Sequence, residues 1–111
     1  MTIDDLTAYK GVVFGEYERA KANNSSRLPS LIFQLASLEE SIAEEQAKAG
    51  NPDRAAVNYV SQGSFLFEMG HIPEGKAAWE RAKSLTTKES LRNWIDEGLK
   101  QYSTGITECQ S

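Results

Sequence analysis

The stretch GNPDRAAVNYVSQGSFLFEMGHIPEG, residues 50–75, decides the fold because it contains the same helix-to-helix turn twice. Gly50 and Gly70 each follow a helical pattern, and glycine readily adopts the left-handed conformation that ends a helix. Pro52 and Pro73 follow them closely, and proline is favoured in the first turn of a helix. The stretch therefore predicts one helix that is joined by tight turns to a helix on either side.

Working outward from this stretch, apolar residues recur at spacings of three and four, in segments rich in Ala, Glu, Lys and Leu. This periodicity predicts an all-α protein. We expect a five-helix antiparallel array of helical hairpins in one domain, residues 1–102, and a flexible polar tail, residues 103–111; an irregular helix bundle is the alternative. The helices are expected at about residues 4–22, 29–49, 52–69, 73–84 and 89–102.

The first expected helix is opened by Thr2 and Asp5, which have approximately the spacing of a capping box. Gly11 and Gly15 lie inside it, four residues apart, and we expect them to let a neighbouring helix come close. Its expected buried face consists of Leu6, Tyr9, Val13, Tyr17 and Ala20.

Residues 56–89 contain a definite order of large and small side chains. The positions concerned are Tyr59, Gly63, Leu66, Gly70, Gly75, Trp79, Ala82 and Leu85. In this order the segment resembles one tetratricopeptide repeat, although Gln62 replaces a usual leucine and Thr87 a usual proline. The resemblance implies a fragment of an α-solenoid, in which two helices pack closely through these positions.

The same resemblance implies a binding surface on the inward helix of the hairpin. Its contact positions would be Val57, Val60, Ser64 and Phe67. We expect a non-catalytic adaptor that binds a peptide or amphipathic helix of another protein in an apolar groove. In one alternative the first two helices cover these residues as ordinary core. In another the chain is a structural subunit that self-associates into a homodimer or larger assembly.

Composition argues against several other partners. The chain of 111 residues has 12 Lys and Arg against 16 Asp and Glu, so its net charge is −4 and it has no basic patch for nucleic acid. No apolar stretch approaches the roughly 20 residues of a membrane span. The start, MTIDDLTAYK, lacks the features of a signal peptide. We therefore expect a cytoplasmic protein that binds neither nucleic acid nor membrane.

Side chains suited to catalysis or metal binding are few. The single histidine, His71, lies in an expected turn, and the single cysteine, Cys109, lies in the expected tail. The glutamates of residues 39–45 have no histidine at the spacing of a di-metal site. We therefore expect no enzyme activity, no cofactor and no metal site.

Overall fold

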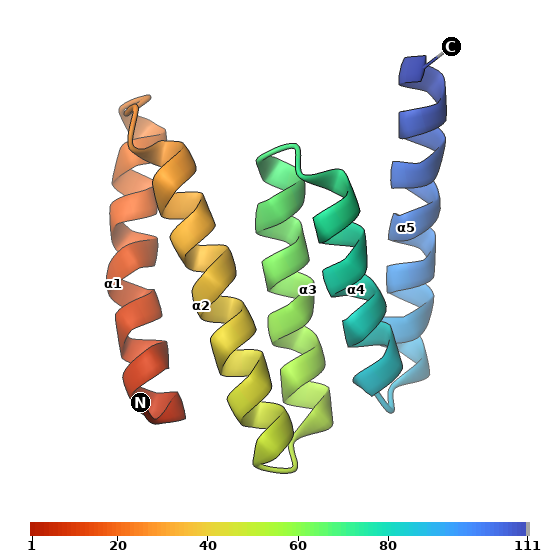
Figure 1. The fold of residues 1–111 in the computed structure, drawn as a ribbon, viewed down its shortest axis with the longest axis horizontal. Helices are drawn as coiled ribbons and strands as arrows, with labels where there is room; N and C mark the ends of the chain where they lie inside the picture. The colour runs from red at the N-terminus through yellow and green to blue at the C-terminus, as the bar shows by residue number, and fades with distance from the viewer. Residues whose placement is uncertain (111) are drawn as a thin grey trace.

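A computed structural model describes the backbone of residues 1–110 and the side chains of residues 1–102. Residues 1–110 contain no strand, so the predicted all-α class is confirmed. Figure 1 shows the helices side by side with alternating directions. They are α1 (Ile3–Ala22), α2 (Leu28–Lys48), α3 (Pro52–Glu68), α4 (Ile72–Leu85) and α5 (Glu89–Gln110).

The ends of the helices follow from local sequence. The backbone N–H of Asp5 donates to the Thr2 hydroxyl at 3.1 Å, and the Thr2 N–H donates to the Asp5 carboxylate at 3.3 Å, which completes the predicted capping box of α1. Gly50 and Gly70 have φ angles of 83° and 82°, in the left-handed region that favours glycine. Both predicted turns are therefore present.

Helix α5 continues beyond its predicted end. The expected end of this helix is near Tyr102, with residues 103–111 as a tail, whereas the helical backbone continues to Gln110. Residues 103–110 contain no proline, so nothing in the backbone forces the helix to stop at Tyr102. The side chains of the expected tail, including Cys109, and all of Ser111 lie outside the described residues.

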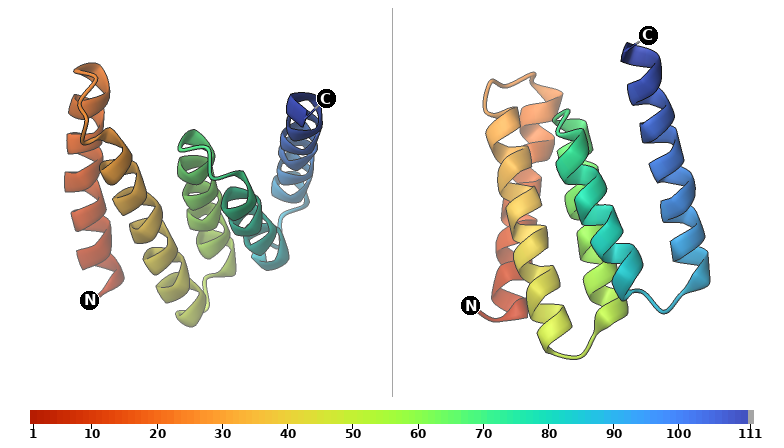
Figure 2. Two further views of the ribbon diagram at one scale, coloured as in Figure 1. Left: turned by 45° about the horizontal axis from the view of Figure 1, so that its top comes forward. Right: turned by 45° about the vertical axis from the view of Figure 1, so that its right-hand side comes forward.

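The helices form a flat array that measures 42 × 38 × 18 Å. Figure 2 shows α2 and α4 in front of α1 and α3 in its right-hand view. Within the described residues, each helix makes backbone contacts only with its neighbours in sequence, so α1 and α3 both pack on α2 without packing closely on each other. This arrangement leaves a groove between α1 and α3.

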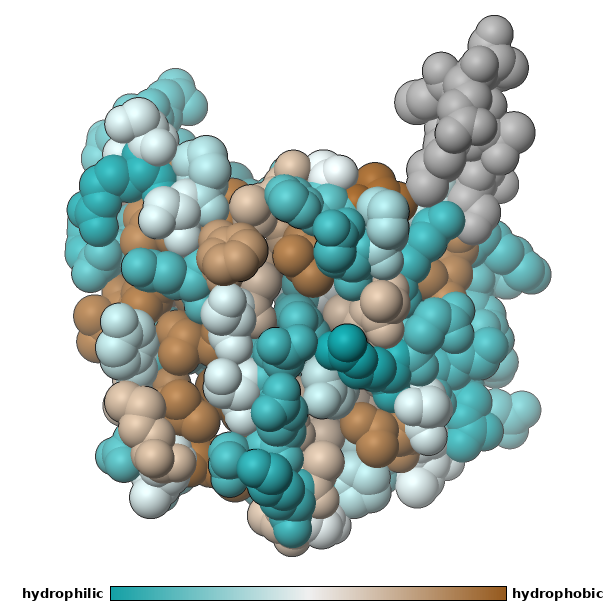
Figure 3. Space-filling view, in the orientation of Figure 1, coloured by the Kyte–Doolittle hydropathy of each residue, from teal (hydrophilic) through white to brown (hydrophobic). Residues whose placement is uncertain are grey.

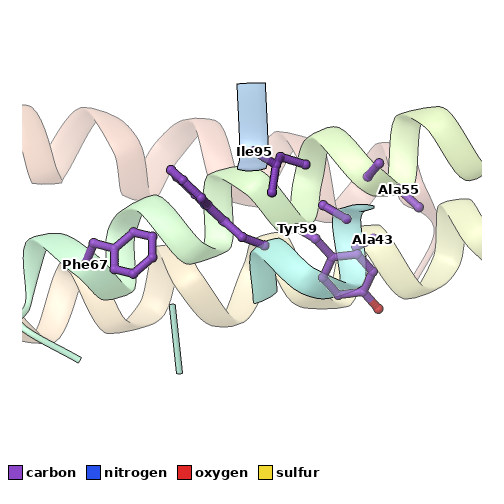
Figure 4. Packing of buried hydrophobic residues seen from close by; sticks show 8 residues of the cluster. Ala43, Ala55, Tyr59, Phe67 and Ile95 are labelled. Atoms are coloured by element: carbon purple, nitrogen blue, oxygen red, sulfur yellow. The ribbon is translucent and has the colours of Figure 1, made fainter. Parts of the chain in front are cut away.

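Trp79 is central to the core that joins α3, α4 and α5. Its indole lies against the backbone of Gly63, and its Nε1 donates a hydrogen bond to the Val60 carbonyl oxygen at 3.0 Å. Figure 4 shows buried residues of this core, with Tyr59, Phe67 and Ile95 among those labelled. Six of the positions expected to pack within the α3–α4 hairpin are buried: Tyr59, Gly63, Leu66, Gly75, Trp79 and Ala82.

A second core joins α1, α2 and α3. It consists of Val13, Tyr17, Ala20, Leu31, Ile32 and Leu35. Tyr9, which we expected on the buried face of α1, is 49% exposed. The expectation that Gly11 and Gly15 admit a neighbouring helix is wrong, because a Cβ on Gly11 would meet nothing within 4 Å and one on Gly15 would meet only the Arg19 guanidinium.

Candidate partner-binding groove

The groove between α1 and α3 has a volume of about 460 Å³. Helices α1 and α3 form its walls, and α2 forms its floor. Its lining consists of Lys10, Gly11, Phe14, Leu35, Glu39, Val60, Ser61, Ser64 and Phe65. The groove is mostly apolar, as protein sites for small molecules and side chains usually are.

Aromatic side chains from opposite walls define the apolar part of this groove. Phe14 on α1 is 41% exposed, and Phe65 on α3 is partly buried against the second core. Leu35 on α2 is fully buried beneath them. Because Gly11 has no side chain, α1 does not fill the space beside Phe14, and the groove is open there.

A buried carboxylate, that of Glu39 on α2, lies at the floor of the groove. Glu39 is buried, and its Oε1 accepts hydrogen bonds from Lys10 Nζ at 3.3 Å and from Asn58 Nδ2 at 2.9 Å. A buried charge is tolerated when it is paired and hydrogen-bonded in this way. The contacts join α1, α2 and α3 around one carboxylate, so this cluster links both walls of the groove to its floor.

A hydrogen-bond cluster also links α1 to α3 beyond the two phenylalanines. The Tyr17 hydroxyl lies 3.1 and 3.0 Å from the two carboxylate oxygens of Glu68, and Lys21 Nζ donates to that hydroxyl at 3.1 Å. The hydrogen bond to Tyr17 and the charge of Glu68 raise the pKa of Lys21, so its ammonium form is favoured. The cluster connects two helices that have no close backbone contact.

The four predicted contact residues have different environments. Val60 and Ser64 line the groove, and the Ser64 hydroxyl donates to the Val60 carbonyl oxygen at 2.9 Å. Val57 is 57% exposed but lies outside the groove lining. None of the three is sealed beneath the first two helices.

Phe67 requires a correction. It is only 8% exposed, its ring stacks on that of Tyr102 at 3.8 Å, and it meets Trp79 edge to face at 4.9 Å. The resemblance to a tetratricopeptide repeat implied that Phe67 is a contact position, but packing by α4 and α5 buries it in the core. Phe67 therefore belongs to the fold rather than to an open contact surface.

Seven residues of the groove lining were not expected from the sequence. They come from α1 (Lys10, Gly11 and Phe14), α2 (Leu35 and Glu39) and α3 (Ser61 and Phe65). One signal was present in the sequence, because Phe14 falls outside the regular apolar face of its helix. A large apolar side chain outside the buried face, three residues after a glycine, is compatible with a groove on that side of the helix.

A second hollow, of about 280 Å³, lies between α2, α3 and α4. It is more polar, since the Glu40 carboxylate accepts from Gln62 Nε2 at 3.1 Å and from Arg81 Nη1 at 3.2 Å. Buried Gln62 leaves its Oε1 without a hydrogen-bond partner.

Figure 3 shows hydrophobic residues mainly over the α1 side of one broad face and hydrophilic residues mainly over its α5 side.

Within residues 1–102, no three His, Cys, Asp or Glu side chains are placed to hold a metal ion. His71 Nδ1 lies 3.8 Å from Glu74 Oε2 at the exposed start of α4.

No helix among the described residues has the length and apolar character needed to cross a bilayer. Comparisons with protein-family models, with curated proteins and with solved structures give no match to this chain.

Proposed function

We propose that this protein is a non-catalytic interaction module, a tetratricopeptide-like adaptor that holds a peptide or amphipathic helix of another protein in the groove between α1 and α3. The observation that carries the proposal is the open apolar groove whose two walls stand apart on a shared floor helix. Helical hairpins that stack side by side create concave surfaces of this kind for binding extended partners.

The lining specifies the chemistry of the ligand. Phe14, Phe65 and Val60 offer apolar contact area, which suits aliphatic or aromatic side chains of the partner. The charges of Lys10 and Glu39 already neutralise each other, so the groove offers no unbalanced charge to a ligand. We therefore expect a partner segment that inserts apolar side chains rather than a charged terminus.

Gly11→Leu provides a direct test because it fills the groove without disturbing a contact. A Cβ at this position meets nothing within 4 Å, and leucine is a better helix former than glycine, so the variant is expected to fold. The control is Gln34→Leu, which adds the same side chain at an exposed position of α2 outside the groove.

A displayed library of amphipathic helical peptides serves as the probe. Peptides with apolar anchors should be enriched on the wild-type protein and on Gln34→Leu, and their affinity for Gly11→Leu should fall by about tenfold or more because the leucine occupies the groove. If the wild-type protein enriches no peptide, or if enriched peptides bind Gly11→Leu equally well, the proposed site is wrong.

A self-associating subunit is the second candidate function. It is favoured by two exposed apolar side chains of α1, Tyr9 and Val12, which lie outside the groove lining. The two functions are compatible, since they use different faces of the same helix.

A further inference from the structure

One side of α1 carries two exposed apolar side chains. Val12 is 65% exposed, and Tyr9, three residues before it, is 49% exposed. Among the described helices, α1 makes backbone contacts with α2 alone, so no other helix covers this face. Exposed apolar side chains that lie together on one face are typical of interaction surfaces.

Charged residues flank Val12 symmetrically on this face. Asp5 and Arg19 each lie about two helical turns from Val12, in opposite directions, and such a spacing brings all three to nearly the same side of α1. All three are exposed. Asp5 and Arg19 take part in no ion pair within the described residues.

We propose that this face binds the same face of a second copy of the chain, as a symmetric antiparallel dimer centred on Val12. In that arrangement Val12 meets Val12 of the second copy at the two-fold axis. Asp5 meets Arg19 of the second copy, and Arg19 meets its Asp5, so two ion pairs form at once. A parallel arrangement would instead place like charges together, which costs free energy.

Small residues allow the two helices to approach. Ala8 and Gly15 lie on one side of the line through Asp5, Val12 and Arg19, and a Cβ on Gly15 would meet only Arg19 Nη1, at 3.8 Å. The contact is limited to one helix from each copy, which is less than the roughly 1,200–2,000 Å² that stable complexes bury. We therefore expect a reversible dimer with a dissociation constant in the micromolar range or weaker.

The dimer would leave both grooves accessible. Lys10 and Phe14 project from α1 about half a turn away from Val12, so the groove lining lies outside the proposed contact. Each dimer would present two grooves, and two linked sites bind a bivalent partner more tightly than one. The inference deepens the second candidate function, self-association, on which it rests, and it does not depend on the peptide groove.

Sedimentation velocity of the full chain, from micromolar to millimolar concentration, tests the dimer. The wild-type protein should shift reversibly from monomer to dimer and no further. Val12→Glu should weaken the dimer by about tenfold or more, because it buries two like charges at the two-fold axis. Val57→Glu is the matched control, since it changes a comparably exposed valine on α3 and should leave the dimer unchanged.

Substitutions of Arg19 test the antiparallel pairing without altering Asp5, whose carboxylate also accepts the Thr2 N–H in the capping box of α1. Arg19→Glu should weaken the dimer by about tenfold or more, whereas Arg19→Lys keeps the charge and should dimerise much as the wild type does, with circular dichroism confirming that each variant remains helical. A monomer at every concentration, growth beyond a dimer, a dimer unaffected by Val12→Glu, or equal effects of the two Arg19 substitutions would overturn the proposal. Gly11→Leu should dimerise normally, so failure of the groove proposal and failure of this one give different results.

Discussion

The indole ring of Trp79 occupies the space that a side chain at Gly63 would need. A Cβ at position 63 would collide with Trp79 Cδ1 and would lie 2.8 Å from the backbone oxygen of Gly75. The indole cannot easily move, because its Nε1 donates to the Val60 carbonyl oxygen. The contact therefore makes the α3–α4 hairpin depend on a residue without a side chain.

Gly63→Ala should lower the free energy of unfolding by about 1–3 kcal/mol, the usual cost of overpacking, even though alanine favours helices. Gly11→Ala is the control, since its Cβ enters open space and should raise stability by about 0.5–1 kcal/mol. Urea denaturation of both variants measures the difference. Equal effects of the two substitutions would contradict the packing described for Trp79.

Phe67→Ala should lower the free energy of unfolding by about 3–5 kcal/mol, because it leaves a cavity between Trp79 and Tyr102. Phe67→Glu should cost more, since it buries a carboxylate among aromatic rings. Val57→Glu, on the exposed side of the same helix, should stay within about 0.5 kcal/mol of the wild type. Thermal melts followed by circular dichroism separate these outcomes, and a Phe67→Glu protein that melts like the wild type would place Phe67 outside the core.

Tyr17→Phe removes the hydroxyl that connects α1 to Glu68 on α3. The loss of this partly exposed hydrogen-bond cluster should lower the free energy of unfolding by about 1 kcal/mol. Peptide affinity at the groove should also fall, because the two walls lose one of their links. Denaturation and peptide titration on the same variant check both effects, and an unchanged affinity would show that the Glu39 cluster alone sets the spacing.

Asp53 makes the stability depend on pH. The backbone N–H of Thr87 donates to its carboxylate at 2.7 Å, and the hydroxyls of Thr87 and Thr86 donate at 2.8 and 2.9 Å. These hydrogen bonds, the backbone one first, lower the pKa of Asp53. A lowered pKa in the folded state gives stability that is present above the unfolded value of about 3.9 and is lost as the pH falls through the folded value.

Asp53→Asn should therefore be less stable than the wild type at pH 7, and the difference should shrink as the pH falls below about 4. Urea denaturation of the variant and of the wild type across this pH range measures the difference. A difference for Asp53→Asn that stays constant with pH would mean that the hydrogen bonds do not depend on the carboxylate charge.

Much of the fold was predictable because its signals are local. Gly50 and Gly70 end helices through the conformational freedom of their own backbone, and Thr2 caps α1 through residues in the adjacent turn. The close packing at Gly63 and Trp79 was expected from the resemblance to a tetratricopeptide repeat, which puts these positions in the packing of the two helices. The end of α5 was expected too early because the residues after Tyr102 are mostly polar, whereas the helical backbone continues to Gln110 with no proline to stop it.

The sequence by itself therefore determined the five helices, their turns and the close packing within the α3–α4 hairpin. Only the tertiary structure decided which side chains border the groove, because α1 and α3 are not neighbours in sequence and their spacing depends on how each packs on α2. It also decided that Phe67 is buried while Val57 on the same helix is exposed. Helical periodicity places residues on a face, but the neighbouring helices determine which part of that face they cover.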